Sequence, residues 1–314
     1  MKILILANLE DRHIAQIKAI APEAELMVTT DRNKAVSLAP EAEIMVGWNL
    51  PREAIAQAPN LKWIHSTAAG VDQLLFPEIL EREILVTTSS GIHAIPLCEH
   101  VFAMMLALSR RLHYAIRQQI HRRWDRRGSV GGELGGGTLG ILGLGHIGVE
   151  LAKRAVAFEM RVIGTKRTPS PVPFVERVLP PEGLDEVLME SDVVVIALPL
   201  TPQTRGLIGE RELRLMKPTA FLINVGRGPI VQERALIRAL REGWIAGAAL
   251  DVFEQEPLPA DSPLYDLENV ILTPHVAGTS PRYMDRAIPL FCENLGRYLR
   301  GEPLLNVVDK KRGY

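Results

Sequence analysis

Residues 139–148 read Leu139-Gly140-Ile141-Leu142-Gly143-Leu144-Gly145-His146-Ile147-Gly148, an apolar run that ends in three glycines spaced G-x-G-x-x-G. The residues that follow have the apolar spacing of an amphipathic helix, and another apolar run comes at 161–165. This order predicts strand, tight turn, helix and second strand, the unit that holds the pyrophosphate of a dinucleotide. In such a unit Gly143 permits the turn, Gly145 admits the pyrophosphate to the backbone, and Gly148 lets the helix pack on the strand.

Short apolar runs recur on both sides of this motif, and helical patterns separate most of them. Many runs are apolar nearly throughout, as strands buried on both faces of a parallel sheet must be. The order therefore predicts an α/β protein with helices on both faces of parallel sheets. The expected strands cover residues 2–7, 44–48, 61–66, 85–88, 139–144, 161–165, 193–198, 221–225, 247–252 and 270–272, and the expected helices cover 12–20, 73–80, 147–158, 184–189 and 233–242.

The longest helical pattern, residues 97–119, interrupts this alternation. Its segment 101–108 is apolar on nearly every face, so we expect it to be buried at a domain junction. A last helix is expected at 282–299, followed by an apolar tail that docks on the first domain. The expected fold is thus two Rossmann- or flavodoxin-like domains with parallel sheets, in which a cofactor domain is inserted into a substrate domain. The substrate domain takes residues 1–95 and 283–314, and the dinucleotide-binding domain takes residues 96–282.

Composition excludes several classes of protein. Of the 314 residues, 47% are hydrophobic and 23% are charged, which is typical of a folded globular chain. The 36 Lys and Arg residues against 37 Asp and Glu give a net charge of −1, so neither nucleic acid nor an anionic membrane is expected as a partner. Two cysteines are too few for a disulfide framework or a Cys-rich metal site, and no metal is expected. No apolar run reaches membrane-spanning length and no signal peptide is found, so we expect a cytoplasmic protein.

The end of the second strand of the dinucleotide unit discriminates between cofactors. A carboxylate there binds the ribose 2′-hydroxyl of NAD, whereas Arg or Lys accommodates the 2′-phosphate of NADP. This chain has Thr165, Lys166 and Arg167 and no acidic residue at that place. Two adjacent cations favour an anion between them, so NADP(H) is preferred and NAD(H) remains possible. A solvated basic turn without a ligand is the alternative.

Three further segments place polar residues after apolar strands, at residues 224–228, 251–257 and 273–278. Open α/β sheets bind ligands at the carboxyl ends of their strands, which is where these segments lie. Taken singly, Arg227 would be read as a loop salt bridge and His275 as a hydrogen-bonded loop histidine. An arginine, a carboxylate and a histidine on successive strand ends of one cofactor-binding sheet instead indicate a reaction centre.

These three segments, the glycine turn and Thr67-Ala68-Ala69-Gly70-Val71-Asp72 resemble the D-isomer-specific 2-hydroxyacid dehydrogenases over essentially the whole chain. The resemblance implies that Arg227, Glu256 and His275 are catalytic. It also implies that the amides of Ala69 and Gly70 hold the substrate carboxylate. Beyond the turn glycines and the residues at 165–167, it implies cofactor contacts at His146, Ile147, Leu198, Pro199, Thr204, Val225, Gly226, Arg227, Asp251, His275 and Gly278.

The expected reaction interconverts a small 2-keto acid and its D-2-hydroxy acid by hydride transfer. Arg227 would supply planar donors for the carboxylate and carbonyl, and His275 would act as acid and base. Glu256 would hold the imidazole ring and favour its protonated form. In lacking an acidic residue after the second strand, this chain resembles the family members that reduce glyoxylate and hydroxypyruvate with NADPH. A nucleotide-sensing binding or corepressor module that has kept the fold is the alternative, and it would not need all three residues.

A basic stretch at residues 110–127 contains seven arginines and one aspartate. A solvated helix face that continues into a subunit contact accounts for it better than nucleic-acid binding, given the net charge. The family resemblance implies a homodimer formed through this region.

Overall fold

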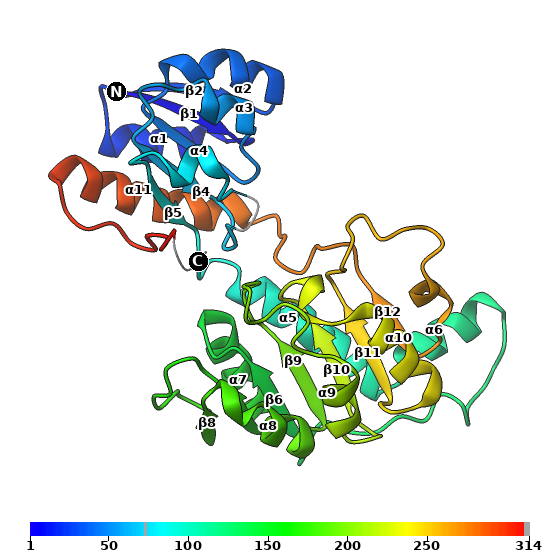
Figure 1. Cartoon of the computed structure of the whole chain (residues 1–314). Coiled ribbons are helices and arrows are strands. Elements are labelled where there is room, and N and C mark those ends of the chain that lie inside the picture. Colours follow the sequence, from blue (N-terminus) through cyan, green and yellow to red (C-terminus); the bar gives the residue numbers. More distant parts are fainter. Residues whose placement is uncertain (72–73, 311–314) are drawn as a thin grey trace. The chain divides into compact units, whose positions relative to one another are not determined.

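The computed structural model describes residues 1–71 and 74–310 (Figure 1). The chain divides into two compact units, one of Met1–His93 with Ser280–Tyr314 and the other of Ala94–Thr279. The sequence placed the two junctions at 95–96 and 282–283. Asp72, and the start of the expected helix 73–80, lie outside the described residues. The substrate and cofactor roles of the two units stay predictions at this point.

The first unit contains a parallel sheet of five strands in the order β2-β1-β3-β4-β5. Alternate residues of each strand point to opposite faces. On β1, Ile3 and Ile5 therefore enter one apolar cluster, and Leu4 enters the other. The strands are β1 Lys2–Leu6, β2 Glu25–Thr29, β3 Ile44–Gly47, β4 Trp63–Ser66 and β5 Leu85–Thr88.

Helices cover both faces of this sheet, as its fully buried strands require. The first and last helices of the unit, α1 (Asp11–Ile20) and α11 (Tyr283–Arg300), lie side by side on one face (Figure 1). Three short helices cover the other face: α2 Arg32–Leu38, α3 Arg52–Ala56 and α4 Pro77–Leu80. The unit is therefore built from both ends of the chain.

A polar group is buried inside this unit at the ends of β4 and β5. The His65 ring lies 2.8 Å from the Thr87 hydroxyl through Nδ1 and 3.1 Å from the Ser89 hydroxyl through Nε2. Burial lowers the pKa of His65 to about 3, so the ring is neutral near pH 7. A neutral imidazole between two hydroxyls satisfies its polar atoms without a buried charge. The contact fastens β4 to the segment that follows β5.

The second unit contains a parallel sheet of seven strands in the order β12-β11-β10-β9-β6-β7-β8. The strand order reverses between β6 and β9, and ligands bind at such a point in open α/β sheets. The predicted class, α/β with two parallel sheets, is confirmed. The strands are β6 Thr138–Leu142, β7 Arg161–Thr165, β8 Arg177–Leu179, β9 Val193–Ile196, β10 Phe221–Asn224, β11 Gly247–Leu250 and β12 Val270–Leu272.

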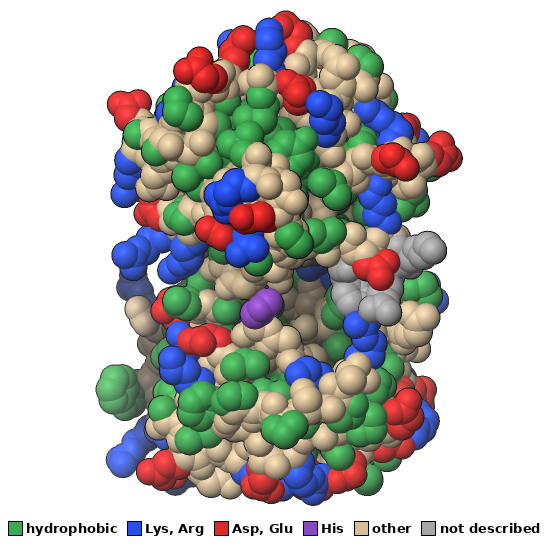
Figure 2. Space-filling view, turned by 90° about the vertical axis from the view of Figure 1, so that its left-hand side faces the viewer, with side chains coloured by type: hydrophobic (Ala, Val, Ile, Leu, Met, Phe, Trp, Pro, Cys, Tyr) green, Lys and Arg blue, Asp and Glu red, His purple; other side chains and the backbone are tan. Residues whose placement is uncertain are grey.

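Five helices cover the faces of this sheet. On one face α5 (Ala94–Ser109) and α7 (His146–Ala157) pack on an apolar layer that includes Ile141 and Val195. The opposite face carries α8 Leu184–Glu190, α9 Glu210–Leu215 and α10 Glu233–Glu242. The face of the molecule in Figure 2 shows basic and acidic side chains interspersed.

The expected helix at residues 97–119 is wrong as a single element. The chain forms α5, which ends at Ser109, and a separate helix α6 (Leu112–Ile120). Arg111 between them has a φ of 51°, in the left-handed region. The last carbonyls of α5 take other partners: Ala107 accepts from the His113 ring, and Ser109 accepts from the amide of Gly132. These bonds end the helix where the apolar pattern alone would continue it.

Two strands were not predicted, β2 and β8. β2 forms one edge of the first sheet and β8 one edge of the second, and each pairs with a single neighbour. Their residues are half-exposed for the most part, and their apolar runs are short, with three residues in β2 and two in β8. The short helices α2, α3 and α9 were missed as well.

Candidate active site

The glycine turn joins β6 to α7 at the point where the strand order reverses. Gly143 has a φ of +105°, and a Cβ there would lie 2.8 Å from the carbonyl oxygen of Ala197. A Cβ on Gly148 would lie 2.5 Å from the carbonyl oxygen of Gly143. A Cβ on Gly145, in contrast, would have no described atom within 4 Å. The fold itself requires the outer two glycines, whereas the middle one borders open space at the start of α7.

That open space suits an anion. Gly145 is the N-cap of α7, and His146 and Ile147 are the first two residues of this helix of twelve residues. The first amides of a helix lack acceptors within it and carry a partial positive charge. The residues present therefore fit the pyrophosphate of a dinucleotide cofactor.

The end of β7 is tied to the same turn. The carbonyl of Thr165 accepts hydrogen bonds from the amides of Gly143, at 3.3 Å, and Leu144, at 3.0 Å. Lys166 follows, and its Nζ donates to the Ser170 hydroxyl at 2.8 Å. The next residue, Arg167, is exposed. A hydroxyl-bonded lysine and an arginine thus stand where NAD-binding domains have a carboxylate.

The segment after β9 lies against the glycine turn and against the segment after β10. Ala197 opposes Gly143, and a Cβ on Gly226 would lie 2.7 Å from the carbonyl oxygen of Leu198. Thr204 closes the turn that follows, because its hydroxyl donates to the Pro199 carbonyl at 2.7 Å. The structure therefore brings the predicted residues after β6, β9 and β10 to one edge of the sheet.

Arg227 lies in a backbone loop held from both sides. The Asn224 side chain accepts from the Gly226 amide at 3.1 Å and donates to the Arg227 carbonyl at 3.0 Å. A Cβ on Gly228 would overlap the carbonyl group of Phe253. Both glycines beside Arg227 are required, because neighbouring loops pass too close for any side chain.

Asp251 follows β11 and holds the segment that carries His275. Its carboxylate is 2% exposed, and it accepts from the Thr273 hydroxyl at 2.6 Å and from the amides of Val276 and Ala277 at 2.9 Å each. The amide of His275 donates to the Asp251 carbonyl at 2.9 Å. Both carboxylate oxygens are thus engaged by this segment. The contact of Asp251 with the nicotinamide stays a prediction.

His275 and Glu256 are in direct contact. Nδ1 of His275 lies 2.7 Å from Oε2 of Glu256, and Oε1 accepts from the Phe253 amide at 3.0 Å. A carboxylate only accepts, so Nδ1 is the donor and Nε2 is left for a substrate. Both side chains are partly exposed. A His–carboxylate pair is therefore assembled within one unit, and its role as a general acid stays a prediction. Of the remaining predicted residues, Val225 is buried and Gly278 half-buried.

Two residues that sequence reasoning did not assign complete this part of the site. Thr273 donates to Asp251, and the ring of His100, on α5, lies 3.0 Å from the Thr273 hydroxyl. Thr273 stands two residues before His275 and could have been suspected from that position. His100 is one of four histidines in or near the helix expected at 97–119, with His93, His113 and His121, and no pattern distinguishes it before folding.

Ala69 and Gly70 belong to the first unit, in the loop after β4. Ala69 is exposed and Gly70 is half-buried. Before them, the amide of Ala68 donates to the Ser66 hydroxyl at 3.2 Å. The amide of Ser89 donates to the carbonyls of Ser66 and Ala68. Among the described residues, neither the Ala69 amide nor the Gly70 amide donates to an acceptor of the chain. This agrees with the prediction that both amides donate to a substrate carboxylate.

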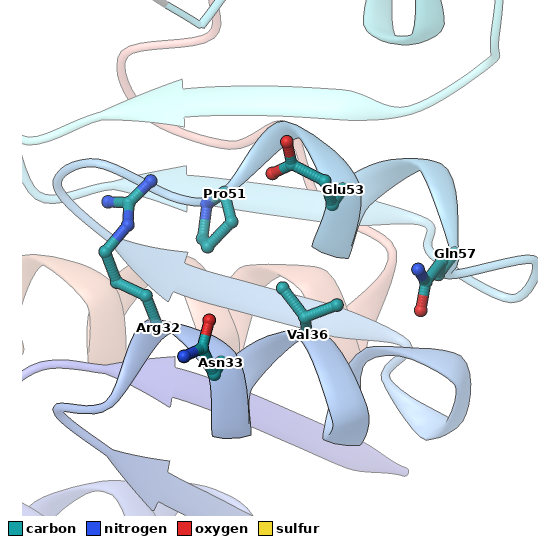
Figure 3. A pocket seen from close by; sticks show the side chains of 6 residues that line it. All are labelled: Arg32, Asn33, Val36, Pro51, Glu53 and Gln57. Carbon is teal, nitrogen blue, oxygen red and sulfur yellow. The ribbon is translucent and has the colours of Figure 1, made fainter.

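A surface pocket elsewhere in the first unit holds no predicted site residue. It lies between α2 and α3, where the Arg32 guanidinium also donates to the Asn49 carbonyl at 2.6 Å. Its lining residues are Arg32, Asn33, Val36, Pro51, Glu53 and Gln57 (Figure 3).

Over residues 1–71 and 74–310 no three His, Cys, Asp or Glu side chains come together in a way that would hold a metal ion. Within the same residues, every helix is too short or too polar to cross a bilayer.

The profile of the D-isomer specific 2-hydroxyacid dehydrogenase NAD-binding domain matches residues 102–277, more than half of the chain. The chain belongs to the D-isomer specific 2-hydroxyacid dehydrogenase family. A glyoxylate reductase of Thermofilum pendens is 41% identical over 268 residues, which cover 82% of this chain and 78% of that protein. The predicted family is confirmed, and the protein is an NAD(P)-dependent oxidoreductase of 2-hydroxy acids.

Solved structures of the family agree over nearly the whole chain. A family member from Aeromonas salmonicida has a TM-score of 0.89 and 35% identity, and the match covers 98% of this chain and 99% of that one. A member from Xanthobacter autotrophicus, solved with NADPH and MES, has a TM-score of 0.85 and 33% identity, with coverage of 100% and 99%.

Adding a methyl group to Gly145 or to Gly148 should have two different effects. Gly145→Ala should fold with an unchanged Tm but bind NADPH at least about tenfold more weakly, because its Cβ enters the space for the pyrophosphate. Gly148→Ala should lower the Tm, because its Cβ meets the Gly143 carbonyl. Fluorescence titration with NADPH and thermal unfolding of both variants measure these effects. Wild-type affinity in Gly145→Ala would contradict the assignment.

Proposed function

We propose that this enzyme reduces glyoxylate or hydroxypyruvate to the corresponding 2-hydroxy acid, with NADPH as the preferred reductant. The observation that carries the proposal is the 2.7 Å contact between His275 Nδ1 and Glu256, which leaves Nε2 as a proton donor. The glyoxylate reductase of Thermofilum pendens supports the choice of substrate.

The proposed roles follow from the geometry of each side chain. As hydride reaches C2 of the keto acid, negative charge develops on the carbonyl oxygen, and Nε2 of His275 gives that oxygen its proton. Glu256 keeps Nδ1 protonated and balances the charge of the imidazolium. In the oxidative direction His275 takes the proton back. When bound, the reduced nicotinamide supplies the hydride.

Two groups are proposed to hold the substrate. The guanidinium of Arg227 offers planar donors to the carboxylate and carbonyl oxygens. The backbone carbonyl of Arg227 accepts from the Asn224 side chain, and its guanidinium donates to the Gly226 carbonyl at 2.8 Å. The amides of Ala69 and Gly70 are proposed to bind the carboxylate.

The preference for NADPH rests on the end of β7. Lys166 and Arg167 follow Thr165 directly, and the Lys166 ammonium is bonded to a neutral hydroxyl instead of a carboxylate. A 2′-phosphate would gain charge-assisted hydrogen bonds there. A ribose 2′-hydroxyl would find no carboxylate at the strand end to accept its proton.

We also propose that the enzyme is a homodimer formed through α6. Leu112, Ile116 and Ile120 are spaced by four residues, so they share one face of this helix, and they are 52%, 49% and 72% exposed. Trp124 follows and is 97% exposed. An apolar row of this kind costs free energy in water and is typical of a subunit contact. A second copy of the chain is the proposed occupant, and the arginines at 122–127 would lie at its rim.

The proposed reaction predicts oxidation of NADPH when glyoxylate or hydroxypyruvate is added to the purified protein. His275→Ala should lower kcat by about 10²- to 10⁴-fold, the usual contribution of a positioned acid, while NADPH affinity stays within about twofold. Absorbance at the NADPH band follows the reaction, and fluorescence titration gives the affinity. No turnover of a panel of 2-keto acids with either cofactor would contradict the proposal.

The proposed cofactor preference predicts a higher kcat/KM with NADPH than with NADH. Lys166→Asp should reduce the ratio of kcat/KM with NADPH to kcat/KM with NADH by at least about tenfold, since a favourable contact with phosphate becomes a repulsion. Lys34→Asp, which makes the same charge change on the first unit, is the control and should leave the ratio unchanged. An equal ratio in wild type and Lys166→Asp would refute the assignment.

The proposed dimer predicts twice the chain mass in light scattering after size exclusion. Ile116→Glu should shift the protein toward the monomer, because a charge would be buried in the contact. Met189→Glu is the matched control, since Met189 is exposed on α8 of the same unit. A monomeric wild type, or a dimer that tolerates Ile116→Glu, would exclude α6 as the contact.

A further inference from the structure

A hydroxyl group from the start of α11 reaches the loop after β4. The Tyr283 hydroxyl donates to the Thr67 carbonyl at 2.7 Å, across 216 residues of sequence. Thr67 is two residues before Ala69, the first of the two proposed carboxylate-binding amides. The neighbouring Ala68 carbonyl accepts from the Ser89 amide at 3.0 Å. Consecutive carbonyls of this loop are thus held by different parts of the first unit.

Peptide planarity turns these carbonyl bonds into constraints on amides. The carbonyl of one residue and the amide of the next share a rigid plane and point in opposite directions. The Tyr283 bond therefore orients the Ala68 amide, which donates to the Ser66 hydroxyl at 3.2 Å. The Ser89 bond orients the Ala69 amide in the same way. Together they determine the direction in which the loop presents its next donors.

The side chains of residues 68–70 contribute little to holding this loop. Ala68, Ala69 and Gly70 carry a methyl group or no side chain at all, so packing of side chains cannot orient their amides. Glycine also enlarges the range of accessible backbone angles. The backbone hydrogen bonds are therefore the main constraint on this segment, and the Tyr283 hydroxyl is the side-chain donor to the Thr67 carbonyl.

Tyr283 is itself well fixed. Its ring lies against the His93 ring, with centroids 5.1 Å apart and planes inclined by 59°. Burial raises the pKa of Tyr283, so the hydroxyl stays protonated and remains a donor near neutral pH. Burial, with a smaller effect of Arg286, lowers the pKa of His93 to about 4, so the ring beside it is neutral. The pair adds no charge that would compete for a substrate carboxylate.

We propose that Tyr283 is a positioning residue for substrate, whose hydroxyl fixes the loop at residues 67–70 so that its amides meet the carboxylate of the 2-keto acid. This inference rests on the proposed function. It links the first residue of α11 to substrate affinity and assigns it no part in hydride or proton transfer.

The test compares two tyrosines of the same helix. Tyr283→Phe removes the hydroxyl and leaves the ring against His93. Tyr298→Phe is the matched control, because the Tyr298 ring stacks on Trp63, with centroids 5.2 Å apart, away from the loop. Steady-state kinetics with glyoxylate and NADPH are measured for wild type and both variants. Inhibition by oxalate, a carboxylate analogue that is not reduced, and thermal unfolding are measured alongside.

Tyr283→Phe should raise the KM for glyoxylate and the Ki of oxalate by about five- to tenfold, the effect of losing one buried hydrogen bond. Its kcat and its KM for NADPH should stay within about twofold of wild type, and Tyr298→Phe should match wild type throughout. A loss of stability alone would not separate the KM for substrate from the KM for cofactor in this way.

Unchanged KM and Ki values in Tyr283→Phe, with an active wild type, would overturn this inference and leave the proposed function standing. Equal increases in Tyr283→Phe and Tyr298→Phe would also overturn it, since packing of α11 would then be the cause. A wild type that reduces neither glyoxylate nor hydroxypyruvate would overturn the proposed function, and this inference with it.

Discussion

Backbone packed directly against backbone underlies the arrangement at the carboxyl edge of the seven-stranded sheet. Gly143 lies against Ala197, Gly226 against Leu198, and Gly228 against Phe253, each at a distance that excludes a Cβ. Loops in such contact cannot shift independently, because protein interiors are packed as densely as crystals. The positions of Arg227 and of the cofactor turn follow from these three contacts. An alanine at any of them would displace a neighbouring loop along with its own.

A buried carboxylate adds a second constraint, of a different physical kind. Asp251 lies at the end of β11, and its two oxygens accept three hydrogen bonds from the segment around His275. A carboxylate so deeply buried is tolerated only when it is fully hydrogen-bonded. If it were removed, the buried groups that donate to it would lose their acceptor, which costs free energy. The geometry of the His275–Glu256 pair therefore depends on a residue that need not touch the substrate. His275 itself has a φ of 54°, which these bonds stabilise.

Much of the architecture could be predicted because it depends on local patterns. The buried strands are short apolar runs, and the glycine turn carries its own spacing, so the two parallel sheets and the turn between β6 and α7 followed from sequence. The break before Arg111 depends on Gly132 and His113 finding the end of α5, which is a tertiary event. The edge strand β2 has only three apolar residues in a row, Leu26-Met27-Val28, and two of them are partly exposed. Tyr283 and His100 act through partners far away in sequence, and a residue type alone does not signal such contacts.

The inserted arrangement of the chain has a consequence for biosynthesis. Residues 94–279, which form the second unit, are contiguous and are synthesised together. The first unit is completed only by later residues, including Tyr283 at the Thr67 carbonyl and Asn306, whose side chain donates to the carbonyls of Thr88 and Ser90. Domains form from the N-terminus as the ribosome releases them. The glycine turn after β6 therefore has all its residues while the loop at 67–70 still awaits its last hydrogen bonds, so on the proposed roles a nascent chain would gain the nucleotide-binding part of the site before the part that orients a keto acid.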